Sequence, residues 1–321
     1  TRVMSNCNGP EVTNGRGNLS FTTINLPRLA IKANKDMPTF WKSLDDVIDL
    51  AIKQLLTRYE VQKNLKVKDF PFLMGQHLYV DSEDLKPNDS VEKAIRNGTL
   101  SIGFIGLAEC LKAMVGKHHG ESDAAQALGL SIVSHMRQRC DEATEKYHLN
   151  FSLLATPAEQ LSGKFTKLDV QRYGIIKGVT DKEWYTNSFH IPVEYEIDAL
   201  KKIALEGPYH KYCNAGHISY VELPSAPKGN LEAFETLVRA MYDNDMGYAA
   251  VNFPVDICKD CGLNGVIETE TCPKCGSRNI SRVRRITGYL STLDNFNDSK
   301  LAEAKARRIH MKLPPVMRQE D

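Results

Sequence analysis

Four cysteines toward the C-terminal end place the strongest constraint on how this chain folds. Cys258, Cys261, Cys272 and Cys275 form the pattern C-x2-C-x10-C-x2-C within eighteen residues, and a glycine follows each pair. Two such tight turns can arrange four thiolates tetrahedrally around one ion, and Zn2+ suits four soft ligands in a closed structural site. We therefore predict a zinc-binding module. An iron centre of the rubredoxin type stays an alternative, because ligand spacing does not separate the two metals.

The other four cysteines are scattered singly along the 321 residues. An even number of cysteines can also indicate a disulfide framework, but that interpretation applies mainly to short secreted chains. We expect Cys110, Cys140 and Cys213 to be ordinary buried or half-buried thiols. Cys7 lies in a turn-like Ser-Asn-Cys-Asn-Gly-Pro stretch.

The composition is that of an ordinary globular protein. Lys and Arg total 41 against 40 Asp and Glu, a net charge of +1, and 42% of the residues are hydrophobic. This balance argues against disorder and against direct nucleic-acid binding. No uncharged apolar run approaches the roughly 18 residues that a membrane span needs. The start, Thr-Arg-Val, shows no secretory signal, so we expect a soluble, cytoplasmic chain that is a fragment or has lost an upstream segment.

The first 250 residues alternate between strand-like and helix-like patterns. Repeated βα units favour an α/β fold in which helices cover a sheet or a barrel. The predicted strands are 19–26, 99–107, 149–155, 217–223 and 248–253, and the predicted helices are 41–55, 122–147 and 231–241.

The stretch Thr156-Pro-Ala-Glu159 follows the third predicted strand and has the features of a helix start. Thr156 would be the N-cap, proline would occupy the first helical position, and Glu159 would complete a capping box. A capped helix N-terminus presents free backbone amides and a positive dipole end, so this junction could bind phosphate.

Other polar residues receive simpler interpretations. The charged tail at 300–312 contains interleaved Ala, Leu and Ile, which favours a solvated helix face over a nucleic-acid contact. His190 and His217 lie in strand-like segments and are expected to be hydrogen-bonded core histidines. His118 and His119 have no second cluster of ligand residues nearby, so we do not predict that they bind metal.

The segment Arg285-Ile-Thr-Gly288-Tyr-Leu lies just beyond the cysteine module, with its glycine thirteen residues after Cys275. It resembles the glycyl-radical loop of the anaerobic (class III) ribonucleoside-triphosphate reductases. Similar stretches occur in the same order as in that family at 15–28, 102–109, 155–159, 184–190 and 216–223. The resemblance implies a fold in three parts: 1–253 as the C-terminal part of a ten-stranded glycyl-radical-enzyme barrel, 254–281 as the zinc module, and 282–321 as the radical loop and charged tail.

The same resemblance implies radical chemistry at Gly288. Glycine can store an unpaired electron on its α-carbon because the electron delocalises over both flanking peptide groups. In the family, a radical SAM activase with an iron-sulfur cluster removes a hydrogen from this glycine. The glycyl radical then generates a thiyl radical on a cysteine, which takes the 3′-hydrogen of the ribonucleotide, and the 2′-hydroxyl leaves as water. Formate or a dithiol supplies the electrons.

Several further expectations follow from the resemblance. The family's thiyl cysteine would fall just upstream of Thr1, and Cys7 is the nearby substitute. Asn18 corresponds to a position near the substrate, and Thr156, Ala158 and Glu159 to a substrate-binding stretch. The expected partners are the activase, ribonucleoside triphosphates, a second copy in a homodimer, and the N-terminal part of the reductase if the enzyme is split.

Three other functions remain open at this point. The first is a different glycyl-radical enzyme, such as a formate acetyltransferase relative, although those generally lack the zinc module. The second is a zinc-ribbon binding module with a phosphate-facing patch formed by Arg278, Arg282, Arg284 and Arg285. The third is a spare-part protein that replaces an oxygen-cleaved radical domain.

Overall fold

The computed structural model describes residues 5–310, which divide into two compact units. The first unit runs through Thr156 and also contains Asn187–Phe189 and Tyr209–His217. The second contains Pro157–Thr186, His190–Pro208 and the described residues from Ile218 onward. Among the described residues, no helix combines the length and the apolar character that a membrane crossing requires.

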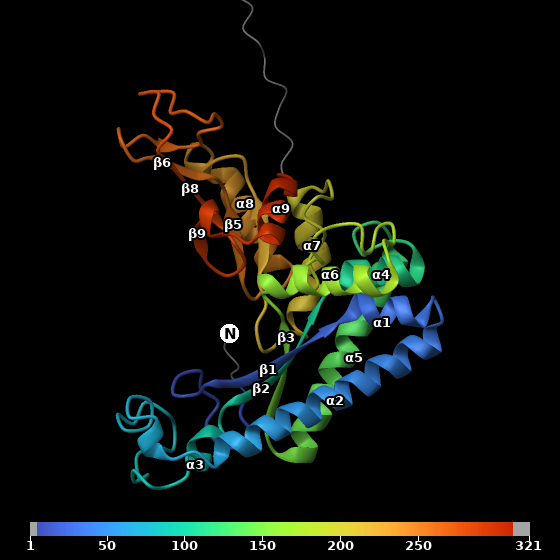
Figure 1. Cartoon of the computed structure of the whole chain (residues 1–321), viewed down its shortest axis with the longest axis vertical. Helices are drawn as coiled ribbons and strands as arrows, with labels where there is room; N and C mark the ends of the chain where they lie inside the picture. Colours follow the sequence, from blue (N-terminus) through green and yellow to red (C-terminus); the bar gives the residue numbers. More distant parts are fainter. Residues whose placement is uncertain (1–4, 311–321) are drawn as a thin grey trace, which may run out of the picture. The chain divides into compact units, whose positions relative to one another are not determined.

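The first unit is built on a parallel three-stranded sheet in the order β1-β2-β3. Strands β2 and β3 are buried along their whole length, as expected for parallel strands covered by helices. Helices α2 and α5 run along this sheet (Figure 1) and contribute apolar side chains to the core. The elements are β1 (Asn18–Asn25), α1 (Leu26–Ala33), α2 (Met37–Lys63), α3 (Glu92–Ile95), β2 (Thr99–Ile105), α4 (Leu107–Val115), α5 (Asp123–Tyr147) and β3 (Asn150–Ala155).

Two helices of this unit begin where local sequence chemistry places a cap. The Asp36 carboxylate accepts a hydrogen bond from the Thr39 amide at the start of α2. The Ser122 hydroxyl accepts one from the Ala125 amide at the start of α5. Side-chain oxygens satisfy amides that have no partner within the helix, so these starts are encoded locally.

The second unit contains two small sheets. Strands β4 and β5 form a parallel pair, and the order of the other sheet is β7-β6-β8-β9 with antiparallel neighbours. The elements are α6 (Gln160–Tyr173), α7 (Ala199–His210, whose last two residues belong to the first unit), β4 (Ser219–Glu222), α8 (Leu231–Asp243), β5 (Ala249–Asn252), β6 (Val255–Cys258), β7 (Asn264–Gly265), β8 (Ile280–Arg285), β9 (Leu290–Thr292) and α9 (Asp298–Ala306).

The mixed α/β fold predicted from the sequence is confirmed, and the five predicted strands correspond to β1 to β5. No sheet formed by the described residues closes into a barrel. Helix α8 forms where predicted, but of its expected apolar side only Leu237 is buried, whereas Leu231 is 70% exposed.

The predicted helix start at Thr156 is wrong. Helix α6 begins at Gln160, after Glu159, and no side chain caps it. The Thr156 hydroxyl instead lies 3.1 Å from the hydroxyl of Thr23 on β1. A tertiary contact therefore replaces the local capping box.

The prediction of a solvated charged tail holds for Lys305 and Arg308, which are exposed, but is wrong for Lys300 and Glu303. Lys300 is fully buried in α9, and its ammonium contacts Glu303, which is 5% exposed. Arg307, just beyond the helix, lies 3.0 Å from the same carboxylate. Mutual pairing lets these charges leave water, which a pattern of charged residues alone does not reveal. Residues 311 and 312 of the predicted tail lie outside the described residues.

Candidate functional site

The four cysteines of the C-x2-C-x10-C-x2-C pattern meet at one point in the second unit. Their sulfur atoms all lie within 4.8 Å of one another. Cys258 and Cys275 are 3.6 Å apart, as are Cys261 and Cys272. Sulfurs about 2.3 Å from a tetrahedral zinc ion lie roughly 3.8 Å from one another, so the cluster matches a four-thiolate site.

Local backbone geometry explains how the two cysteine turns form. Gly262 and Gly276 both have φ +73°, in the left-handed region that favours glycine. Their amides donate to the carbonyl oxygens of Cys258 and Cys272, at 2.9 and 2.8 Å. The glycine that follows each cysteine pair therefore closes the turn.

A buried carboxylate connects the cysteine module to the strand that follows it. Asp256 on β6 is fully buried and accepts hydrogen bonds from the Ile267 amide at 2.9 Å and from Arg284 on β8 at 2.6 Å. Arg282 reaches the same carboxylate at 3.5 Å. Strand β8 pairs with β6, and Ile280 of β8 lies opposite Cys258 of the four-cysteine cluster. The module and β8 are thus one connected structure.

Strand β8 leads directly into the loop that carries Gly288. Strands β8 and β9 form a hairpin (Figure 1) with Arg285 opposite Leu290. The Ile286 amide donates to the Tyr289 carbonyl at 2.9 Å. Gly288 is exposed. Its φ lies outside the left-handed region, and an added Cβ would meet no atom within 4 Å. Neither the turn nor the packing in this structure requires glycine at position 288.

Side chains from other elements hold the base of this loop. The Tyr220 hydroxyl on β4 donates to the carbonyl of Thr287, and Arg307 donates to the carbonyls of Arg285 and Ile286 at 2.8 and 3.1 Å. The Thr287 hydroxyl is buried and finds no hydrogen-bond partner among the described residues.

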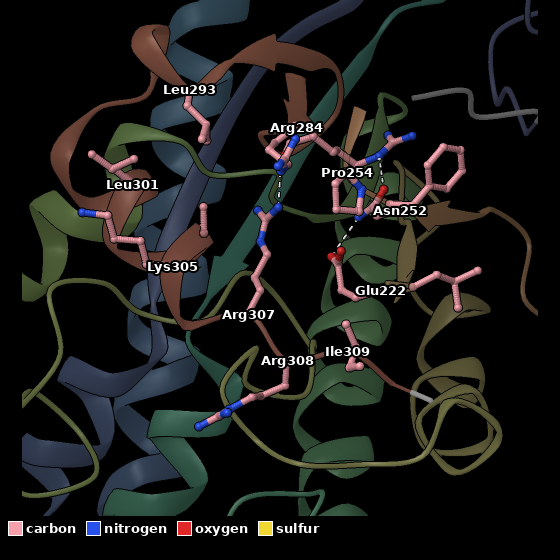
Figure 2. A pocket seen from close by; sticks show the side chains of 14 residues that line it. Glu222, Asn252, Pro254, Arg284, Leu293, Leu301, Lys305, Arg307, Arg308 and Ile309 are labelled. Carbon is pink, nitrogen blue, oxygen red and sulfur yellow. Dashed lines mark hydrogen bonds between the residues drawn. The ribbon is translucent and has the colours of Figure 1, made fainter. Parts of the chain in front are cut away.

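A cavity of about 240 Å3 lies beside the base of the loop (Figure 2). Asn252 lines this cavity. Its side-chain nitrogen donates to the Glu222 carboxylate at 2.9 Å, and its side-chain oxygen accepts from Arg285 at 2.8 Å. The cationic side chains around it are Arg284, Arg285, Lys305, Arg307 and Arg308. Arg284 and Arg285 form hydrogen bonds to Asp256 and Asn252, and Arg307 donates to two backbone carbonyls at the end of β8.

The predicted site residues of the second unit come together only in part. The Glu159 carboxylate accepts a hydrogen bond from the hydroxyl of Tyr289, the residue after Gly288, at 3.3 Å. Ala158 beside it is buried. His190 is also buried, and its Nε2 lies 2.7 Å from the Ile218 carbonyl, as expected for a core histidine.

The remaining predicted residues belong to the first unit. Cys7 is exposed, and its sulfur accepts a hydrogen bond from Asn8 at 3.3 Å. Asn18 begins β1, where its side-chain oxygen accepts from the Thr99 hydroxyl at 3.3 Å. His217 Nδ1 lies 2.7 Å from the Cys213 carbonyl, so the histidine is hydrogen-bonded as expected, but it is only half-buried and does not lie in the core.

The three singly placed cysteines expected to be ordinary thiols are buried. Burial raises the pKa of each thiol, and that of Cys140 reaches about 12. A thiol with so high a pKa stays protonated and unreactive as a nucleophile at neutral pH. The prediction for Cys110, Cys140 and Cys213 is confirmed.

Sequence reasoning missed the roles of two residues that hold the loop. Tyr220 lies within the stretch 216–223 that contributed to the family resemblance, but nothing in its local pattern indicated a bond to Thr287. Arg307 was assigned to the charged tail. Its spacing of four residues from Glu303 was a signal for an ion pair on a helix.

Comparison with known proteins gives consistent matches. A family model described as anaerobic ribonucleoside-triphosphate reductase matches residues 1–310. The anaerobic ribonucleoside-triphosphate reductase of Escherichia coli K12 is 38% identical over 324 residues, covering 96% of this chain and 44% of that protein. The enzyme of the same name from Enterobacteria phage T4 is 36% identical over 326 residues, covering 96% of this chain and 51% of that protein.

Solved structures agree at the level of the fold. A structure of an anaerobic ribonucleotide reductase superposes with a TM-score of 0.77 at 21% identity, covering 93% of this chain and 46% of that one. The Thermotoga maritima anaerobic ribonucleotide reductase in complex with dATP and CTP gives 0.71 at 22% identity, covering 89% and 44%. The chain spans about half or less of the length of the relatives it matches.

Proposed function

Because this chain belongs to the anaerobic ribonucleoside-triphosphate reductase family, we propose that it supplies the radical-bearing part of an oxidoreductase that converts ribonucleoside triphosphates to deoxyribonucleotides. One observation carries the proposal. Gly288 occupies the loop that follows strand β8, whose other end pairs with Cys258 of the four-thiol cluster, yet neither its backbone angle nor its surroundings exclude a side chain. Glycine at this position is then explained by chemistry, since its α-carbon radical is stabilised by two flanking peptide groups.

In this mechanism Gly288 stores the unpaired electron. A radical SAM activase with an iron-sulfur cluster removes one α-hydrogen, and the exposed hairpin presents that carbon to it. The radical on Gly288 then takes the hydrogen of a cysteine thiol, and the resulting thiyl radical takes the 3′-hydrogen of the ribonucleotide before the 2′-hydroxyl leaves as water. Formate or a dithiol provides the electrons. Cys7 stays the candidate thiyl residue within this chain.

The four thiolates would hold a structural zinc ion. When bound, zinc crosslinks the two cysteine turns and contributes folding free energy. Cys258 ends β6, and Asp256 on that strand is paired with Arg284 on β8, so the crosslink is connected to the strand that precedes Gly288. The thiolates thereby stabilise the base of the hairpin.

For the first unit, we propose that the parallel sheet β1-β2-β3 forms part of the family's ten-stranded barrel. The fully buried parallel strands and their covering helices support this assignment. Asn18 and the stretch Thr156, Ala158 and Glu159 stay proposed contacts of substrate, and the division at 253/254 and 281/282 stays a prediction. Cytoplasmic location, a homodimer and a requirement for the N-terminal part of the reductase belong to the same proposal.

The alternative of a nucleic-acid-binding zinc ribbon receives little support from the arginines beside the metal. Arg282 and Arg284 pair with the buried Asp256, and Arg285 donates to Asn252. These guanidinium groups are already bonded within the protein. A spare-part role stays open, and rescue of a reductase cleaved at its radical glycine would distinguish it.

The decisive experiment is electron paramagnetic resonance after anaerobic incubation of the chain with a radical SAM activase, S-adenosylmethionine and a reductant. The expected result is a doublet from the single remaining α-hydrogen, absent in Gly288→Ala. The Escherichia coli relative, activated in parallel, controls for the activase. A doublet in that relative and none in this chain would contradict the proposal. Cleavage at Gly288 on exposure to oxygen offers a gel-based check.

A further inference from the structure

Three consecutive carbonyl groups before the glycine of the hairpin are each held by a side chain from elsewhere in the second unit. Arg307 donates to the carbonyls of Arg285 and Ile286, at 2.8 and 3.1 Å. The hydroxyl of Tyr220 donates to the next carbonyl, that of Thr287. These bonds fix the peptide planes that lead into the loop.

The tyrosine that makes the last of these bonds is itself held from several sides. Its strand, β4, pairs with β5, and its own backbone carbonyl accepts from Lys202 at 2.9 Å. The guanidinium of Arg285 lies 5.4 Å from the centre of its ring, and the ring of His190 meets it edge-on at 5.4 Å. Burial raises the pKa of Tyr220 well above its ordinary value, so the phenol stays a donor throughout the neutral range.

The Thr287 carbonyl differs from the other two in its chemistry. It belongs to the peptide group whose nitrogen is that of Gly288, and this group is planar because the nitrogen lone pair is shared with the carbonyl. A radical on the Gly288 α-carbon would draw on the same lone pair. A donor on the Thr287 oxygen pulls the lone pair toward the carbonyl and so changes how much spin reaches the Gly288 nitrogen.

We propose that Tyr220 is a positioning residue for the radical loop: its hydroxyl fixes the Thr287–Gly288 peptide plane and sets the spin distribution of the radical on Gly288. This inference rests on the proposed function. Arg307 supports the same arrangement, since it donates to the two preceding carbonyls and its guanidinium lies 3.0 Å from the Glu303 carboxylate. Tyr220 touches no reacting atom and acts through the peptide group.

The test compares Tyr220→Phe with the wild-type chain, both containing 15N-glycine and activated under the same conditions. Tyr242→Phe is the matched control, because Tyr242 lies on α8 with 84% of its surface exposed. In Tyr220→Phe the 15N hyperfine coupling of Gly288 is expected to increase. The radical should also decay about threefold to tenfold faster, the range that corresponds to one ordinary hydrogen bond. The control should match wild type in both measurements.

Each outcome has one meaning. No doublet in the wild-type chain, with the Escherichia coli relative activated, contradicts the proposed function itself. A wild-type doublet with the same coupling and decay in Tyr220→Phe overturns the role of Tyr220 alone. If Tyr220→Phe fails to fold, the same measurements are made on the chain with 3-fluorotyrosine at position 220. This residue keeps the ring and makes the phenol a stronger hydrogen-bond donor. The coupling should then decrease, and an unchanged coupling overturns the inference.

Discussion

The ammonium nitrogen of Lys202 lies 2.7 Å from a carboxylate oxygen of Glu206, one turn further along α7, and both side chains are buried. Burial alone would raise the pKa of Glu206, but Lys202, His190 and the Ile191 amide outweigh it and lower the pKa to about 2. Lys202 also donates to the backbone carbonyl of Tyr220. The pair therefore supports the strand from which Tyr220 reaches the loop that carries Gly288.

Replacing Lys202 with Met should destabilise the chain by about 3–5 kcal/mol, because it leaves Glu206 buried without its partner. Denaturant unfolding at neutral pH measures the loss. The neighbouring Lys201→Met provides a matched control, since Lys201 is exposed, and its change should stay within about 0.5 kcal/mol. Equal losses in the two variants would show that the pair contributes no specific stability.

Gly288→Ala should leave the unfolding free energy within about 0.5 kcal/mol of wild type while abolishing the radical signal. An added Cβ meets nothing within 4 Å at this position. At Gly207, in contrast, a Cβ would lie 2.3 Å from the backbone oxygen of Asn244, so Gly207→Ala should cost about 1–3 kcal/mol. Thermal or denaturant unfolding of both variants checks the contrast. A large loss at Gly288 would mean that glycine is needed there for folding after all.

The purified chain should carry one zinc ion, held by Cys258, Cys261, Cys272 and Cys275. Cys258→Ser and Cys272→Ser should each lose most of the metal and unfold at lower denaturant concentration, because metal binding contributes to folding. Elemental analysis measures the content, and Cys7→Ser, at an exposed cysteine, should keep its zinc. Full metal content in the ligand variants would exclude this site.

The zinc module is also expected to be needed for activation. Cys258 adjoins β8 through the pairing of β6 with β8, and β8 leads into the hairpin. Loss of zinc should therefore loosen the loop and reduce the glycyl radical yield in the activation assay. If Cys258→Ser or Cys272→Ser acquired a full radical signal with the activase, the proposed link between zinc and loop would fail.

The sequence predicted those features that depend on local pattern. Repeating apolar positions located the strands β1 to β5, and the cysteine spacing located a cluster whose sulfurs lie within 4.8 Å of one another. Long-range contacts decided the rest. Thr156 bonds to Thr23, 133 residues away, so its capping role was lost. Lys300 and Glu303 became buried through mutual pairing, and Tyr220 reaches Thr287 across 67 residues.

Acid should destabilise the chain partly through His310. Burial lowers the pKa of His310 to about 3, with Lys202 acting in the same direction and Glu206 and Asp198 opposing it. Its Nδ1 accepts a hydrogen bond from the Glu222 amide at 2.9 Å, which only the neutral ring can do. Between about pH 6.5 and pH 3 the unfolded chain therefore binds the proton more readily than the folded chain, and stability should fall as the pH is lowered.

The variant His310→Asn isolates the contribution of His310 to acid sensitivity. The amide oxygen of asparagine can accept the same hydrogen bond, but the side chain does not titrate. The unfolding free energy, measured at pH 7, 6 and 5, should fall less steeply in the variant than in wild type. The two slopes should differ by at most about 1.4 kcal/mol per pH unit, the value for one proton. His190 and His217, whose pKa values are also lowered by burial, remain in both proteins and cancel in the comparison. Parallel pH profiles for the two proteins would assign the acid sensitivity to other groups, since the only titrating side chain removed is that of His310.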